Sequence, residues 1–191
     1  FDAYCTLQGF HIRSTDMVQA FLNSVATRNI FVDLPKEIGK PGYCMRLLKM
    51  LYGFRASPKC WMETLTAELQ KLGFSTFPDD PSLLIRARQY VDKHGKKRDS
   101  TILVCAYVDD IKWGTNDEPA AVEAIEQLKE VFDITDEECL STYLGLRYTR
   151  TITDGMMKLK VDQTAYIQTL IKRFHLDTVT MDPRRYHTPL P

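Results

Sequence analysis

The chain has 191 residues, which is enough for one good-sized hydrophobic core or for one domain and a piece of another. Hydrophobic residues make up 44% and charged residues 26%, which argues against disorder, and no apolar run approaches the roughly 20 residues of a membrane span. The formal net charge of +0 does not indicate a polyanionic partner. Basic residues nevertheless gather at 36–59, 93–98 and 147–173, which fits either a basic groove or several solvated faces.

The cysteines and the N-terminus bear on the compartment. The five cysteines are dispersed and form no C-x-x-C pair, so we expect free and mostly buried thiols, not a disulfide framework. The N-terminus lacks a basic region followed by an apolar one, so no signal peptide is predicted. We therefore expect an intracellular, cytoplasmic protein.

The first part of the chain predicts short elements. Residues 1–7 have the apolar spacing of a helix, and residues 10–15 alternate as a strand with Asp16 at its end. Residues 17–25 fit a short helix or turn, and residues 30–32 another brief strand. Because the helical pattern is already present at Phe1, we expect a fragment that lacks residues at its N-terminus.

The middle of the chain predicts one long helix and several strands. Ser57-Pro58 begins an amphipathic helix, because proline is favoured in the first turn, and Gly73 ends it. Its core side carries Trp61, Leu65, Leu69 and Leu72. Strands are predicted at 74–77 and 83–85, followed by a basic surface loop at 93–98.

The last part predicts two hairpins and two helices. The apolar runs 101–108 and 111–113 predict a hairpin with Asp109 and Asp110 at its tip, followed by a helix from Glu118. Strands at 143–152 and 156–161 follow, then a helix capped by Asp162 and an extended tail at 182–191. This irregular order of strands, hairpins and helices predicts an α+β fold with a mostly antiparallel sheet packed on helices.

Three carboxylates stand at predicted strand ends. Asp109 and Asp110 are adjacent, so they repel each other and need a cation or a well-hydrated turn. If the strand that ends at Asp16 lies beside their hairpin, all three acids face one another at one end of the sheet. Such oxygen-rich clusters hold pairs of Mg²⁺ ions in phosphoryl transfer. The alternative interpretation is that all three are ordinary turn and cap aspartates.

Sequence motifs add a resemblance to a known family. Tyr107-Val108-Asp109-Asp110 matches the Y-x-D-D box of reverse transcriptases. In the same order, further segments resemble blocks of the copia-type family of LTR retrotransposons: Asp16 with Ala20-Phe21-Leu22-Asn23, Lys49 to Pro58 followed by Trp61, Leu72-Gly73-Phe74 with Asp80-Pro81-Ser82-Leu83, Tyr143-Leu144-Gly145-Leu146, and Tyr166 to Phe174. The resemblance runs from about Gly9 to Pro189. One four-residue box is weak evidence, whereas this ordered series is strong.

The resemblance implies a reverse-transcriptase-like palm with partial fingers over residues 1–161, bearing the Y-V-D-D hairpin. The start of a thumb or connection with an extended tail would occupy residues 162–191. Asp16, Asp109 and Asp110 would be the catalytic and metal-binding residues of an RNA-directed DNA polymerase that adds dNTPs to a primer 3′-hydroxyl with two Mg²⁺ or Mn²⁺ ions. Because neighbouring strand residues point to opposite faces, Asp110 is expected to coordinate less directly than the other two.

The same resemblance implies residues that bind the substrates. The nucleotide-binding residues would be Phe21, Tyr52, Gly53 and Arg55, with the ring of Phe21 against the sugar. Primer and template would contact Tyr107, Leu144, Gly145, Leu146, Arg147, Lys158, Lys160, Lys172 and Arg173. Phe21, Tyr52 and Trp61 fit equally well as buried packing residues.

The implied partners are an RNA template, a DNA or RNA primer and dNTPs. The remaining fingers, thumb and ribonuclease H segments of a parent polyprotein, or a host complex, would complete the assembly. The alternative function is a catalytically inactive, truncated or domesticated palm that serves as a structural or binding subunit. A metal-dependent nuclease that uses the same acids is a third possibility, with no motif beyond the carboxylates.

Overall fold

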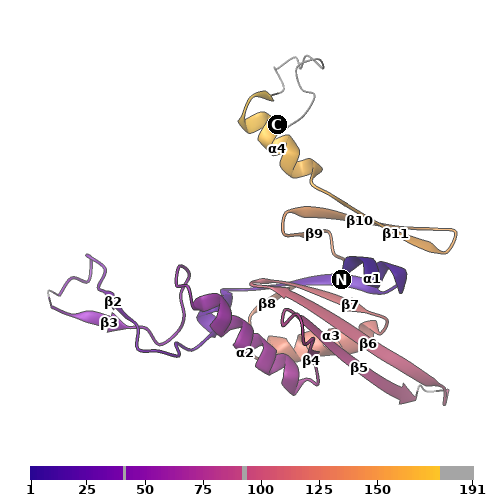
Figure 1. Ribbon diagram of the computed structural model, residues 1–191, viewed down its shortest axis with the longest axis horizontal. Coiled ribbons are helices and arrows are strands. Elements are labelled where there is room, and N and C mark those ends of the chain that lie inside the picture. The colour runs from indigo at the N-terminus through magenta and orange to yellow at the C-terminus, as the bar shows by residue number, and fades with distance from the viewer. Residues whose placement is uncertain (41, 92–93, 177–191) are drawn as a thin grey trace. The chain divides into compact units, whose positions relative to one another are not determined.

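The computed structural model describes residues 1–40, 42–91 and 94–176, which form two compact units (Figure 1). The first unit is Phe1–Leu140, and the second begins at Ser141. This boundary precedes the predicted one at 161/162, because the strands after residue 141 form a sheet of their own. The assignment of these parts to palm, fingers and thumb stays a prediction, and the extended tail predicted at 182–191 lies outside the described residues.

The first unit is built on a six-stranded sheet in the order β4-β5-β6-β7-β1-β8. The strands are β1 (His11–Met17), β4 (Ser75–Thr76), β5 (Leu83–Val91), β6 (Lys97–Tyr107), β7 (Asp110–Thr115) and β8 (Ile134–Glu137). Every neighbouring pair is antiparallel, which confirms the predicted mixed fold with a mostly antiparallel sheet. Tyr107 pairs with Asp110, so only Val108 and Asp109 connect β6 to β7.

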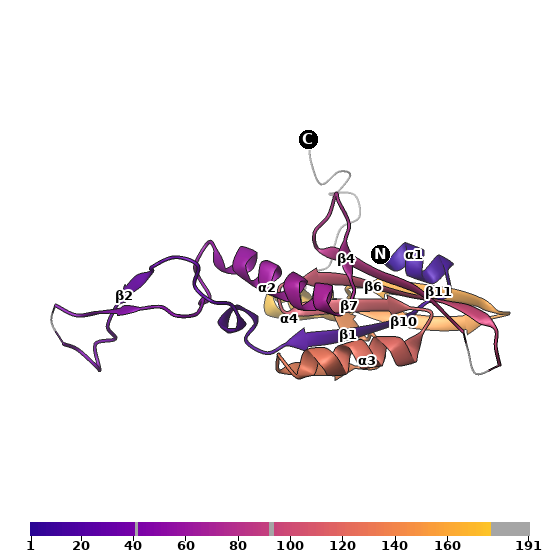
Figure 2. The same cartoon turned by 90° about the horizontal axis from the view of Figure 1, so that it is seen from below.

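Helices cover both faces of this sheet. The helices are α1 (Asp2–Leu7), α2 (Ser57–Lys71) and α3 (Glu118–Lys129), and a 3₁₀ helix, η1, spans Ala20–Asn23. Helices α1 and α3 lie on opposite faces (Figure 2). Strand β1 is therefore buried along most of its length, and only Asp16 within it is exposed.

The main core lies between the sheet and the helices α2 and α3. It contains Trp61, Leu65 and Leu69 of α2, Ala121, Ile125 and Leu128 of α3, and Ile102, Val104, Ile111 and Trp113 of the sheet. Within this core the indole N–H of Trp113 donates a hydrogen bond to Oγ1 of Thr15 at 2.9 Å. This bond adds a side-chain link between β7 and β1 to the six backbone pairs that set their register.

Helix α1 packs on the other face through two kinds of contact. The ammonium group of Lys112 on β7 pairs with the carboxylate of Asp2 at 2.7 Å. Any side chain at Gly114 would collide with Sγ of Cys5, so glycine allows α1 to approach the sheet closely. Together these contacts fix the helix over the centre of β7.

Strands β2 (Phe31–Asp33) and β3 (Cys44–Arg46) form a separate two-stranded ribbon. Its base is closed by an antiparallel bridge between Val25 and Lys49. All residues of β3 are exposed, because the ribbon has no covering layer. The prediction of free thiols is confirmed, but that of mostly buried ones holds only in part: Cys5 and Cys60 are buried, Cys105 is half-buried, and Cys44 and Cys139 are exposed.

The second unit consists of a three-stranded antiparallel sheet and one helix. The sheet has the order β11-β10-β9, with β9 (Thr142–Tyr143), β10 (Leu146–Thr153) and β11 (Met156–Asp162), and helix α4 spans Thr164–Arg173. The predicted cap is confirmed, because Oδ1 of Asp162 accepts a hydrogen bond from the Thr164 N–H at 3.0 Å. No residue of α4 is buried. Within the described residues, no helix of either unit is long and apolar enough to cross a membrane.

Two strand predictions needed correction. The predicted strand at 143–152 is interrupted by a tight turn at Leu144 and Gly145, which both have positive φ values of 49° and 74°. The basic segment at 93–98 is not wholly a loop, because β5 continues to Val91 and β6 already begins at Lys97. Cross-strand pairing, which a local pattern does not reveal, extends these strands.

Candidate active site

The three predicted acids meet at one end of the six-stranded sheet. Strand β1 pairs with β7 so that Asp16 lies directly opposite Asp110, and both side chains therefore share one face. Asp109 is the second residue of the β6–β7 connection, next to Asp110. The structure thus places the strand of Asp16 beside the hairpin. The sequence analysis predicted that the acids face one another under this condition.

Loss of hydration, and after it mutual repulsion, raises the pKa of two of these acids. Loss of hydration raises the pKa of Asp110 above its usual range, and the charges of Asp16 and Asp109 raise it further. Loss of hydration, followed by the charges of Asp109 and Glu137, also raises the pKa of Asp16. A cation placed among the three carboxylates would relieve this repulsion.

Asp109 has one satisfied and one unsatisfied carboxylate oxygen. Oδ2 accepts a hydrogen bond from the hydroxyl of Tyr52 at 3.0 Å. Oδ1 is buried and has no hydrogen-bond partner among the described residues. Buried polar atoms are almost always paired, so the unpaired state of this oxygen points to a cation or a water molecule as its partner.

The connection that carries Asp109 is strained and held from two sides. Val108 has φ = 55°, a left-handed conformation that is costly for a β-branched residue. The indole N–H of Trp61 donates a hydrogen bond to the Val108 carbonyl at 2.7 Å, and the Met17 N–H donates one to the Asp109 carbonyl at 2.8 Å. These two bonds hold the backbone of Asp109 in place against the strain.

Trp61 has a role that the sequence analysis missed. It is fully buried, as the packing interpretation expected, and its ring meets that of Phe132 edge-on at 5.2 Å. The available signal was the indole N–H, because a buried tryptophan normally finds a hydrogen-bond acceptor. Its acceptor is the Val108 carbonyl, next to the candidate catalytic residue Asp109. Trp61 therefore both fills the core and positions the backbone of Asp109.

The predicted nucleotide-binding residues lie at different depths. The ring of Phe21 is buried, and Tyr52, which is 54% exposed, packs on it with ring centroids 4.5 Å apart. Tyr52 therefore links Phe21 to Asp109. Gly53 has φ = 93°, which requires glycine, and Arg55 is exposed in the same loop before α2.

The predicted primer and template residues fall in both units. Tyr107 is exposed at the end of β6 and pairs with Asp110. All the others lie in the second unit: Leu144, Gly145, Leu146, Arg147, Lys158, Lys160, Lys172 and Arg173. The structure therefore does not bring them together with the acids inside one compact unit.

Within the second unit the basic residues have a definite arrangement. In the β10–β11 ladder Arg147 pairs with Asp162, Thr149 with Lys160, and Thr151 with Lys158. Because alternate residues point to the same side, Arg147, Lys158 and Lys160 share one face. Asp162 forms ion pairs with Arg147 and Lys160 at 3.0 and 3.4 Å, so part of this positive charge is compensated.

The three acids offer oxygen ligands for divalent metal ions. Among the residues that the structure describes, no group of three or more histidine, cysteine, aspartate or glutamate side chains is arranged to enclose a metal ion. Mg²⁺ does not require such a cage, because it is typically held by one or two carboxylates together with substrate phosphates and water. The oxygen donors and the unpaired Oδ1 of Asp109 therefore fit Mg²⁺ bound jointly with a substrate.

Comparison with known proteins gives a consistent result. Residues 2–184 match the family described as "Reverse transcriptase (RNA-dependent DNA polymerase)". The chain is similar to the retrovirus-related Pol polyprotein from transposon RE1 of Arabidopsis thaliana, with 30% identity over 87% of this chain and 11% of that protein. It is also similar to the Pol polyprotein from transposon TNT 1-94 of Nicotiana tabacum, with 23% identity over 86% of this chain and 12% of that protein.

A yeast relative extends the range of organisms. The transposon Ty1-DR4 Gag-Pol polyprotein of Saccharomyces cerevisiae is 26% identical over 72% of this chain and 8% of its own length. The chain thus spans about one-ninth of the length of the Arabidopsis relative.

Proposed function

Because the chain belongs to the reverse transcriptase (RNA-dependent DNA polymerase) family, in its copia-type branch, we propose that it carries the catalytic palm of an RNA-directed DNA polymerase. The observation that supports catalysis is the meeting of Asp16, Asp109 and Asp110 at one sheet end, with a buried oxygen of Asp109 left unpaired. The substrates would be dNTPs, a primer and an RNA template.

In this proposal each residue has a separate task. Asp16 and Asp109 hold Mg²⁺ with the triphosphate, and Asp110 adds negative charge beside Asp16. When bound, two such ions lower the pKa of the primer 3′-hydroxyl and neutralise the charge that develops on the triphosphate. Trp61 and Met17 fix the backbone of Asp109, so its carboxylate needs little rearrangement when the substrates arrive.

The nucleotide side would be formed by the aromatic pair. Tyr52 covers Phe21 and is the more exposed ring, so it would meet the sugar of the incoming nucleotide first. The buried ring of Phe21 would support the ring of Tyr52. Gly53 would let the backbone approach the nucleotide, and Arg55 would pair with a phosphate. The basic face of β10–β11, with Lys172 and Arg173 of α4, would contact the primer–template backbone.

A second candidate function is a catalytically inactive palm that binds or supports other parts of an assembly. The observation that favours it is the occupied Oδ2 of Asp109, which the Tyr52 hydroxyl already engages. In this case the acids would be a remnant, and the surfaces of the chain would carry its role.

Primer extension on an RNA template with Mg²⁺ or Mn²⁺ separates these functions. We expect extension by the wild-type chain, and a loss of at least about 100-fold in Asp109→Asn, because the carboxylate supplies metal-binding charge. Asp79→Asn, which changes one exposed carboxylate elsewhere in the same unit, is the matched control and should keep full activity.

Failure of a well-folded wild-type chain to extend any primer under either metal would refute the polymerase proposal and favour the inactive palm. Template cleavage without extension on the same gel would instead indicate the metal-dependent nuclease.

A further inference from the structure

Strands β5 and β6 extend beyond the rest of the sheet at the end opposite the acids. Strand β7 pairs with β6 only between Ile102 and Tyr107, and β4 reaches β5 only near its start. From Ala87 to Val91, β5 pairs with the stretch of β6 between Lys97 and Thr101 as a two-stranded ribbon (Figure 1). This part, the β5–β6 ribbon, consists mainly of exposed residues.

The sequence of this ribbon is strongly basic. Residues 86–99 contain six lysines and arginines and two aspartates, a net charge of +4 in a chain whose net charge is +0. Such an accumulation of lysine and arginine residues on one projecting element attracts polyanions.

Two arginines fix the base of the ribbon. Arg86 is buried and donates hydrogen bonds to the carbonyls of Leu72 and Ala120 at 3.3 and 2.8 Å. Arg88 donates to the same Leu72 carbonyl at 2.9 Å. The base of the ribbon is therefore tied to the C-terminal end of α2 and to the first turn of α3.

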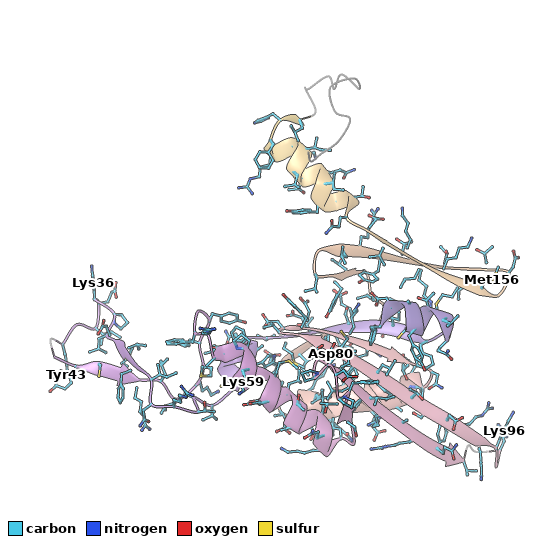
Figure 3. The ribbon with its side chains drawn as sticks, viewed as in Figure 1. Lys36, Tyr43, Lys59, Asp80, Lys96 and Met156 are labelled. Atoms are coloured by element: carbon cyan, nitrogen blue, oxygen red, sulfur yellow. The ribbon has the colours of Figure 1, made fainter. Side chains whose placement is uncertain are left out.

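The outer part of the ribbon combines cations with an aromatic ring. Tyr90 pairs directly with Arg98, so their side chains share one face, and Tyr90 is 45% exposed. Lys96 lies at the end of the ribbon (Figure 3), and Lys97 begins β6 beside it. Exposed aromatic rings next to lysine and arginine are the combination by which proteins bind single-stranded nucleic acid, through base stacking and phosphate contacts.

We propose that the β5–β6 ribbon is a nucleic-acid-binding site, at which Tyr90 stacks on a base and Arg98 on the same face contacts a phosphate. Lys96, and Lys97 on the opposite face, contact phosphates where the strand passes the end of the ribbon. The choice of nucleic acid among polyanions rests on the proposed polymerase function. Strand β6 rises about 3.3 Å per residue, so Lys97 lies about 33 Å along the strand from Tyr107. The site is thus separate from the acids, by the length of about ten nucleotides.

Binding of a fluorescent single-stranded RNA of about 25 nucleotides, longer than this separation, tests the site in EDTA, where no catalysis occurs. The test variant is Lys96→Gln/Lys97→Gln/Arg98→Gln. The control, Lys36→Gln/Lys59→Gln/Lys71→Gln, removes the same charge from exposed lysines outside the ribbon. Figure 3 labels Lys36 and Lys59. Far-UV circular dichroism checks that both variants are folded.

We expect the ribbon variant to bind about 10- to 100-fold more weakly near 100 mM salt, with the slope of log affinity against log salt smaller by about 2. Tyr90→Ala should weaken binding about tenfold, whereas Tyr90→Phe, which keeps the stacking ring, should bind normally. Equal losses in the ribbon and control variants, or normal binding by the ribbon variant, would overturn the site.

The result is independent of catalysis by design. Loss of RNA binding in the ribbon variant of a chain that extends no primer would leave this site standing and remove the polymerase proposal. Normal RNA binding by the ribbon variant of a chain that extends primers would do the reverse.

Discussion

Strand β6 has two contrasting ends. At its C-terminal end lie the acids, and the connection that carries Asp109 is held by Trp61 and Met17 and covered in part by Tyr52. At its N-terminal end lies the basic ribbon, with only two strands and mostly exposed side chains. The acid end is densely packed, whereas the basic end is open to solvent.

The difference matches the physics that each end would use. Coordination of a metal ion depends on the positions of oxygen atoms within fractions of an ångström, so the acid end requires a rigid support. Attraction of phosphates acts over several ångströms and tolerates mobile side chains. At the acid end, a substitution that changes a single atom should therefore alter function. At the basic end, the effect of a substitution should depend on the total charge that it removes.

The largest effect should follow when the support of the acid end is removed. Trp61→Phe keeps a buried ring but deletes the N–H that holds the Val108 carbonyl. We expect a loss of about 1–2 kcal/mol in the free energy of unfolding, and a fall in the primer-extension kcat of about 100-fold as Asp109 is displaced.

Trp113→Phe is the matched control for this change, because it also deletes one buried indole N–H, here the donor to Thr15. It should cost similar stability in chemical denaturation but reduce kcat much less. Equal losses of kcat in the two variants would contradict a positioning role of Trp61.

A smaller effect of opposite sign is expected at Tyr52. Its hydroxyl engages Oδ2 of Asp109, so Tyr52→Phe frees that oxygen for a cation. We expect Mn²⁺ to bind about 3- to 10-fold more tightly by isothermal titration calorimetry. Tyr107→Phe, at an exposed tyrosine beside Asp110, should leave the Kd unchanged, and weaker binding in Tyr52→Phe would show that the hydroxyl assists the metal site.

Much of this arrangement could be predicted from the sequence. The adjacent acids after an apolar run predicted the hairpin end, and Trp61, Leu65 and Leu69 correctly predicted the core side of α2. These features are local, because they depend on periodicity and on neighbouring charges. The pairing of β1 with β7 could be stated only as a condition from the sequence, since no local pattern specifies which strands become neighbours.

The parts that could not be predicted depend on distant contacts. Strand β8 and the full length of β5 exist because partner strands satisfy their backbone groups, not because their own residues alternate. The bond from Trp61 to Val108 joins residues 47 positions apart. The roles of the substrate-contacting residues stay predictions from family resemblance.

The dependence of stability on pH is a further test of the acids, with a smaller expected effect. Because the pKa of Asp110 is raised in the folded chain, its ionisation opposes folding: stability is full below the unfolded pKa of about 3.9 and declines as pH rises through the folded value. Asp110→Asn lacks this charge, so without metal at pH 7 its Tm should exceed that of the wild type by about 1–2 °C. Differential scanning fluorimetry should show this gap closing at low pH and on addition of Mg²⁺; a gap that stays constant with pH would refute mutual repulsion.

The smallest effect is expected for one charge at the basic end. Lys97→Gln removes one exposed cation without disturbing a core contact. It should reduce the salt slope of RNA binding by about 0.7 and leave the free energy of unfolding within about 0.5 kcal/mol of the wild type. A large loss of stability in denaturant titration would mean that the basic end is packed like the acid end.

The register of β1 on β7 determines which residues form the site. A slip of one residue between β1 and β7 would turn Asp16 to the opposite face, toward the core, and separate it from Asp110. The presence of a third acid beside Asp110 therefore depends on the alignment of β1 with β7 as much as on the aspartate at position 16. The six backbone pairs between β1 and β7 keep this alignment, and the bond from Trp113 to Thr15 adds to them from the core side.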